Sequence, residues 1–139
     1  MPEKDNNPAM LAAQNSWRCV MGKLRDEWFD LMADDVCIED PIGVAPTNPT
    51  GEGIRGREGL EQFWTNNIET CERMRIVSEQ SYAAGLESGH VLTLTLDFPG
   101  GVETEVKGIF TYRINEAGKI TNLRGYWGLD EMKVTQPDA

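Results

Sequence analysis

The sequence predicts an α+β fold in which helices come first and an antiparallel sheet follows. Over residues 8–32 and 57–68 the apolar residues recur every three to four positions, whereas a period of two dominates from residue 75 onward. Helices followed by a run of strands indicate a curved sheet with the helices on its concave side. We expect one domain over residues 1–139, with loose tails at 1–8 and 133–139.

Three helices are expected in the first half of the chain. The first begins at Pro8, a residue favoured in the first helical turn, and its apolar spacing is interrupted near Gly22. A second, short helix is expected to end before Asp34 and Asp35, which we interpret as turn or capping residues. The third helix begins near Arg57, and its apolar stripe consists of Leu60, Phe63, Trp64 and Ile68.

A short strand over 36–40 separates the second helix from a long loop. The loop, 41–56, is rich in proline and glycine, and its length indicates a purpose beyond connection, such as a lid.

Four strands are expected after the helices, at 75–83, 90–98, 103–112 and 120–129, with turns at 99–101 and 115–118. Alternation places one row of each later strand on a common inner face. These rows are His90, Leu92, Leu94, Leu96 and Phe98; Thr104, Val106, Gly108, Phe110 and Tyr112; and Leu123, Gly125, Trp127 and Leu129. An inner face of this kind, covered by helices, can enclose an apolar pocket.

The composition narrows the classes of function. A net charge of −10 disfavours nucleic acid and anionic membranes as partners, because both are themselves negatively charged. No apolar run is long enough to span a bilayer and no signal peptide is evident at the start, so we expect a cytoplasmic protein. Three scattered cysteines and a single histidine, His90, predict neither a metal site nor a disulfide scaffold.

Asp40 is the residue that points most clearly to chemistry. Strand alternation directs Val36, Ile38 and Asp40 to the same side, so the pattern that buries two apolar residues also turns a carboxylate inward. An apolar environment raises the pKa of a carboxyl group and makes it a stronger proton acceptor. The alternative interpretation is that Asp40 caps the turn that Pro41 begins.

These residues resemble a known family. The stretch LMADDVCIEDPIG at 31–43, the helix start GREG at 56–59, the NEAGK turn at 115–119 and RGYW at 124–127 are similar to the ketosteroid isomerase branch of the NTF2-like, or SnoaL-like, superfamily. The resemblance spans about residues 8–129. It implies a cone-shaped fold with three N-terminal helices enclosing a pocket, a homodimer, a hydrophobic steroid-like ligand, and neither metal nor organic cofactor.

The resemblance also implies roles for individual residues. In the family, the aspartate at the position of Asp40 moves one proton between two carbons of a ketosteroid. A tyrosine and a protonated aspartic acid stabilise the intermediate, but this sequence has Ser16 and Phe110 at those positions. We therefore expect Tyr112 to donate the hydrogen bond instead, with Ser16, His90 and the indoles of Trp64 and Trp127 as weaker candidates.

We assign catalytic roles to Asp40 and Tyr112. The residues expected to contact the ligand are Ser16, Trp17, Val20, Trp64, Ile68, His90, Leu92, Leu94, Phe110, Leu123 and Trp127. For the two tryptophans, plain core packing is the competing interpretation.

Three functions remain open. The first is a steroid Δ-isomerase that works through Asp40, and the second is a non-catalytic protein that binds a steroid or another hydrophobic ligand. The third is another SnoaL-like reaction, such as polyketide cyclisation, dehydration or epoxide hydrolysis. An inward carboxylate favours the enzyme, since a pocket that only binds apolar ligands gains nothing from an unpaired buried charge.

Overall fold

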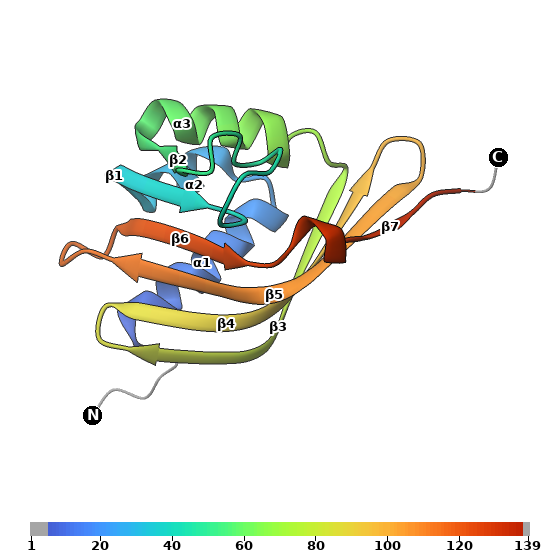
Figure 1. Cartoon of the computed structure of the whole chain (residues 1–139). Coiled ribbons are helices and arrows are strands. Elements are labelled where there is room, and N and C mark those ends of the chain that lie inside the picture. Colours follow the sequence, from blue (N-terminus) through green and yellow to red (C-terminus); the bar gives the residue numbers. More distant parts are fainter. Residues whose placement is uncertain (1–5, 138–139) are drawn as a thin grey trace.

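The computed structural model describes residues 6–137, which form helices followed by a curved sheet (Figure 1). The helical elements are α1 (Pro8–Met21), α2 (Arg25–Asp30), α3 (Gly56–Phe63), a π-helical turn η2 (Trp64–Ile68) and a short 3-10 helix η3 (Leu129–Glu131). The strands are β1 (Met32–Glu39), β2 (Ile54–Arg55), β3 (Arg73–Ala84), β4 (Glu87–Phe98), β5 (Val102–Ile114), β6 (Ile120–Tyr126) and β7 (Lys133–Thr135).

The strands form one sheet in the order β2-β1-β6-β5-β4-β3, and β7 pairs with β5. The predicted α+β class is confirmed, but the sheet is mixed and not wholly antiparallel, because β1 runs parallel to β6. A parallel pair needs a long crossover, and here α3 and the β3–β5 meander provide it. Figure 1 shows α1 lying across the concave face of β3, β4 and β5.

Helix α1 begins as the sequence predicts. Pro8 occupies its first turn, and the Asn7 side chain caps the helix by accepting a hydrogen bond from the Ala9 N–H at 2.7 Å. The helix ends at Gly22, whose N–H donates to the Arg18 carbonyl. The expected loose tail at 1–8 is therefore wrong at Pro8, while residues 1–5 lie outside the described part of the chain.

The tail at 133–139 is also partly wrong, because residues 133–135 form β7. This strand pairs with the beginning of β5, where Thr104 lies opposite Val134. Its three residues are all exposed, so the strand has no buried side that could give it a clear alternation in the sequence. Residues 138–139 lie outside the described part.

Asp34 and Asp35 lie within β1 and not in a turn. The pairing of β1 with β6 shifts register between Met32 and Cys37, which lets two consecutive residues face solvent. The Arg57 guanidinium then pairs with the Asp34 carboxylate at 3.1 Å. This ion pair ties the start of α3 to β1.

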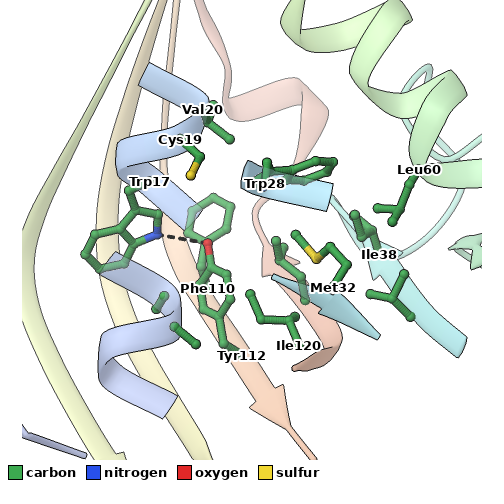
Figure 2. Close-up of a cluster of buried hydrophobic side chains, with 14 of the residues drawn as sticks. Trp17, Cys19, Val20, Trp28, Met32, Ile38, Leu60, Phe110, Tyr112 and Ile120 are labelled. Atoms are coloured by element: carbon green, nitrogen blue, oxygen red, sulfur yellow. Dashed lines mark hydrogen bonds between the residues drawn. The ribbon is translucent and has the colours of Figure 1, made fainter. Parts of the chain in front are cut away.

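The inner rows of the sheet are placed largely as predicted. Leu92 and Phe110 are each 1% exposed and belong to one core with residues of α1, α2 and β1. Figure 2 shows Phe110 among these side chains. Leu129 is an exception, since it is 48% exposed. Strand β6 ends at Tyr126, and the chain has turned into η3 when it reaches Leu129.

Candidate functional site

A cavity of about 260 Å³ lies between the helices and the concave face of the sheet. Its walls come from α1, η2, β3, β4, β5 and the segment that follows β6, and most of the lining side chains are apolar. The polar groups on this wall are few, which is the usual character of a small-molecule site. Their positions therefore indicate what the cavity can recognise.

Most of the predicted site residues lie on this wall. They are Ser16, Trp17, Val20, Asp40, Ile68, Leu92, Leu94, Phe110, Tyr112, Leu123 and Trp127. They reach the cavity from α1, the end of β1, η2 and three strands, so only the fold brings them together.

Trp64 is not on the wall. The residue is 1% exposed and its ring packs against α2, with its centroid 5.4 Å from that of Trp28 and 6.5 Å from that of Phe29. The expectation that Trp64 contacts the ligand is therefore wrong, and plain core packing describes it. Trp28, on α2, reaches the cavity wall in its place.

His90 is buried behind the wall, which also corrects the prediction. Its ring lies edge-on to Trp17 with centroids 4.8 Å apart, so Trp17 separates it from the cavity. Ser81 and Ser88 bind its two nitrogens at 2.7 and 2.8 Å. Burial lowers the pKa of His90 to about 4, so the ring is neutral at physiological pH.

Asp40 follows β1 directly and points into the cavity. The Trp127 indole N–H donates a hydrogen bond to Asp40 Oδ1 at 2.7 Å. This bond fixes the carboxylate, and Oδ2 has no protein donor among residues 6–137. The turn-capping interpretation of Asp40 is not what the structure shows.

Burial raises the pKa of Asp40 from 3.8 to about 6, and the hydrogen bond from Trp127 opposes this rise without cancelling it. The charged form loses hydration in the apolar cavity and gains only one N–H donor in return. A carboxyl group with a pKa near 6 is ionised at neutral pH, and it accepts a proton more readily than an ordinary aspartate.

Gly125 makes room for this carboxylate. A methyl group at Gly125 would lie 2.6 Å from Asp40 Oδ1 and 3.0 Å from both Trp127 Nε1 and the Phe110 ring. Gly125 pairs with Phe110 across β5 and β6, so Asp40 lies at the level of Phe110 in the sheet. Strand alternation predicted that Gly125 faces inward, but its role in making room for the Asp40 carboxylate was not predicted.

The loop after Asp40 is fixed to the site. Asn48 is fully buried, and its side chain donates to the Pro41 carbonyl at 3.0 Å and accepts from the Gly53 N–H at 2.9 Å. The Thr47 hydroxyl donates to the Asp40 carbonyl, and Thr47 also lines the cavity. These bonds tie the loop, which the sequence suggested as a lid, to the residues that follow β1.

Tyr112 carries the second polar group beside Asp40. Its oxygen accepts a hydrogen bond from the Trp17 indole N–H at 2.9 Å, as the dashed line in Figure 2 shows. The Trp28 indole in turn donates to the Ser16 hydroxyl at 3.1 Å. Accepting this bond does not use the phenol's own hydrogen, which the Tyr112 hydroxyl can still donate.

Burial raises the pKa of Tyr112 above its ordinary value, and the negative charge of Asp40 adds to the rise. Hydrogen bonds from Trp17 and Ser16 act in the opposite direction. The phenol therefore stays protonated at neutral pH. Asp40 and Tyr112 both line the cavity, so it offers a proton acceptor and a hydrogen-bond donor on its wall.

Several wall residues escaped the sequence analysis. Asn66, Asn67 and Thr70 come from η2 and the residue pair after it, and Thr47 comes from the loop. In the sequence, the only sign of this role is that Asn66 and Asn67 lie beside the apolar stripe of the third helix. Arg113 and Arg124 are not on this wall and line a separate polar hollow.

Among residues 6–137, no cluster of three or more histidine, cysteine or acidic side chains could hold a metal ion. No helix in the same range is long and apolar enough to cross a membrane.

Comparison with known proteins places this architecture in a family. Residues 14–123 match the SnoaL-like domain. The chain belongs to this family. The match covers the second half of α1, the Asp40 strand, the third helix and the sheet as far as Leu123, so it includes most of the cavity wall.

Solved structures similar to this SnoaL-like chain include a Δ5-3-ketosteroid isomerase from Mycobacterium sp., at 47% identity and a TM-score of 0.89, covering 92% of this chain and 98% of that one. The Mycobacterium tuberculosis protein RV0760c, solved with estradiol-17β-hemisuccinate, is 48% identical with a TM-score of 0.88 and coverages of 92% and 99%. A computationally designed 17-OHP binder is 45% identical with a TM-score of 0.90 and coverages of 94% and 100%.

Proposed function

We propose that the protein is a steroid Δ-isomerase that shifts a carbon–carbon double bond of a 3-ketosteroid, or of a similar polycyclic ketone, into conjugation. The observation that carries the proposal is the presence of the Asp40 carboxylate and the Tyr112 phenol on the wall of one largely apolar cavity. The 47% identity to a named ketosteroid isomerase supports it.

In the proposed reaction, Asp40 Oδ2 removes a proton from the carbon between the ketone and the isolated double bond. The electron pair moves to the ketone oxygen, where the Tyr112 hydroxyl donates a hydrogen bond to the developing charge. Asp40 then returns the same proton to the far end of the former double bond. Substrate and product are isomers, so the step needs no other reactant.

Trp127 and Gly125 assist by position. The hydrogen bond from the Trp127 indole to Oδ1 holds the carboxylate in one orientation. Gly125 leaves the space that both groups need for this contact. The Trp17 bond to the Tyr112 oxygen polarises the phenol, which makes its own hydrogen a better donor.

The direct test is to mix the protein with a Δ5-3-ketosteroid and follow the absorbance of the conjugated enone. A rate that rises in proportion to protein concentration supports the proposal. The absence of enone formation, in a protein that still binds the steroid, would contradict it.

The rate should depend on pH through Asp40. Because the base must be ionised and its pKa is raised to about 6, kcat/KM should rise about tenfold per pH unit below pH 6 and level off above it. Initial rates between pH 4.5 and 8 measure this profile. His90, with a pKa lowered to about 4, does not titrate in the same range. A flat profile would show that another group accepts the proton.

Gly125→Ala should reduce kcat by about tenfold or more, because the added methyl would displace the Asp40 carboxylate from its contact with Trp127. Gly89→Ala is the matched control, since a methyl there would meet only the Thr111 side chain, at 3.9 Å. Steady-state rates of the two variants decide the point. Equal effects would indicate that sheet damage in general, and not carboxylate position, lowers the rate.

A second candidate function is binding without turnover. The observation that favours it is the 45% identity to a designed protein whose stated role is to bind 17-OHP. Quenching of tryptophan fluorescence by a steroid, with no conversion, would support it. The remaining SnoaL-like reactions, such as polyketide cyclisation, dehydration and epoxide hydrolysis, have less support, because Arg113 and Arg124 face away from the cavity and Asp40 is the only carboxylate on the described wall.

We further propose a homodimer and a cytoplasmic location, which the family resemblance and the composition favour. The outer face of the sheet exposes Ile109 and Tyr126 at 51% and 47%, beside the polar hollow that Arg124 lines. An apolar and aromatic surface of this kind suits contact with a second copy.

A further inference from the structure

The cavity has two ends that differ in depth. At the inner end, Leu92 and Phe110 are each 1% exposed and Tyr112 is 4% exposed. At the other end, Leu96, Phe98 and Thr104 are partly exposed, although they belong to the same inward rows of β4 and β5. Asp40 and Tyr112 therefore belong to the inner end, and the opposite end of the wall is the mouth.

The turn η2 lies at the mouth. The Glu72 N–H, just after this turn, donates to the Asp97 carbonyl at 2.7 Å. Asp97 lies between Leu96 and Phe98, and Leu96 pairs with Thr104 on β5. The polar residues that η2 and its neighbour Thr70 contribute to the wall are thus at the end away from Tyr112.

The widened geometry of η2 is visible in its hydrogen bonding, since the Glu69 N–H donates to the Trp64 carbonyl five residues earlier, at 3.0 Å. Such turns are frequent at functional sites. Asn66 and Asn67 both reach the cavity wall from it, and Asn67 is partly buried. Within residues 6–137, neither amide side chain has a hydrogen bond to protein.

The unpaired amide of Asn67, on a largely apolar wall, favours a polar group of the ligand over a hydrocarbon group. The Asn67 amide supplies two donors and an acceptor, so it can pair with either a hydroxyl or a ketone oxygen. Asn66 and Thr104 add further polar atoms around the same opening. In contrast, the wall between the two ends is lined by leucine, valine and isoleucine side chains such as Leu94, Val106 and Ile76.

We propose that Asn67 is a specificity-determining residue that binds an oxygen substituent at the end of the ligand opposite its ketone. This inference rests on the proposed function, because it takes the ketone to be bound by Tyr112. It names the substrate class more narrowly: a rigid polycyclic ketone that is oxygenated at both ends, with a hydrocarbon body.

The test uses two probes that differ only at the far end: testosterone, which carries a hydroxyl there, and androst-4-en-3-one, which does not. Their binding is followed by quenching of the tryptophans that line the cavity, Trp17, Trp28 and Trp127. Asn67→Leu should weaken testosterone binding about 3- to 10-fold and leave androst-4-en-3-one binding unchanged or tighter. Gln62→Leu, an exposed position of α3 away from the wall, is the control and should alter neither.

Equal weakening of both probes by Asn67→Leu, or no weakening of testosterone, would overturn the proposal. The isomerase assay with the same proteins separates this failure from failure of the proposed function. Discrimination between the probes without enone formation would refute catalysis and keep the role of Asn67. Enone formation without discrimination between the probes would support catalysis and refute the role of Asn67. Binding of neither probe would refute both the proposed function and the role of Asn67.

Discussion

Asp40→Asn is expected to lower the turnover of a Δ5-3-ketosteroid by at least 10²- to 10⁴-fold, roughly the contribution of a positioned general base. The amide has nearly the same size and can still accept the Trp127 hydrogen bond, but it cannot take a proton. Enone absorbance under saturating steroid measures the loss in kcat. Rates equal to those of the unmodified protein would show that Asp40 is not the base.

The same variant should be more stable, which separates lost chemistry from lost structure. Since the folded state raises the pKa of Asp40, the stability that this group contributes is full below about pH 3.8 and is lost as pH rises through about 6. Above pH 6 the buried charge costs at most about 3 kcal/mol of unfolding free energy, and asparagine removes that cost. Urea unfolding at pH 7.5 should show this gain, and the gain should disappear near pH 3.5.

Tyr112→Phe is expected to lower kcat by about 10²- to 10³-fold, as removal of one oxyanion donor does in other enzymes. The family positions that normally supply such donors hold Ser16 and Phe110 here, so little else on the inner wall can replace the phenol. The substitution also leaves the buried Trp17 N–H without its acceptor, which costs about 1–3 kcal/mol of stability.

Trp17→Phe provides the control for this variant. It removes the same hydrogen bond from the other side and keeps the Tyr112 hydroxyl, so its loss in kcat should be much smaller than that of Tyr112→Phe. Steady-state rates are compared at a temperature where both variants are folded. A turnover within about twofold of the unmodified protein for Tyr112→Phe would assign the donor role to another group.

The sheet could be predicted from sequence because its signal is local. Alternation along β4 and β5 fixes which residues face inward, and the turn residues at Gly100 and Gly118 mark where the chain reverses. The parallel pairing of β1 with β6 could not be predicted in the same way. It depends on how the intervening elements pack, which no period within either strand records.

Site residues could be predicted where alternation along a strand sets the direction of the side chain. Asp40 and Tyr112 reach the cavity because alternation sets their side, whereas Trp64 and His90 do not, although they were expected to. Trp64 packs against Trp28, and two serines with Trp17 enclose His90. These outcomes depend on neighbours from distant elements. The amides of η2 were missed for a similar reason, since a π-turn has no clear sequence signature.

The bond between Trp127 and Asp40 joins residues 87 positions apart, across the parallel pairing of β1 with β6. During synthesis on the ribosome, the acid therefore emerges long before the indole and glycine that surround it. A nascent chain that has not yet released β6 carries the carboxylate in a half-built, hydrated setting, where its acidity is that of ordinary aspartate. The unusual basicity of this group is thus acquired only when the final strands dock.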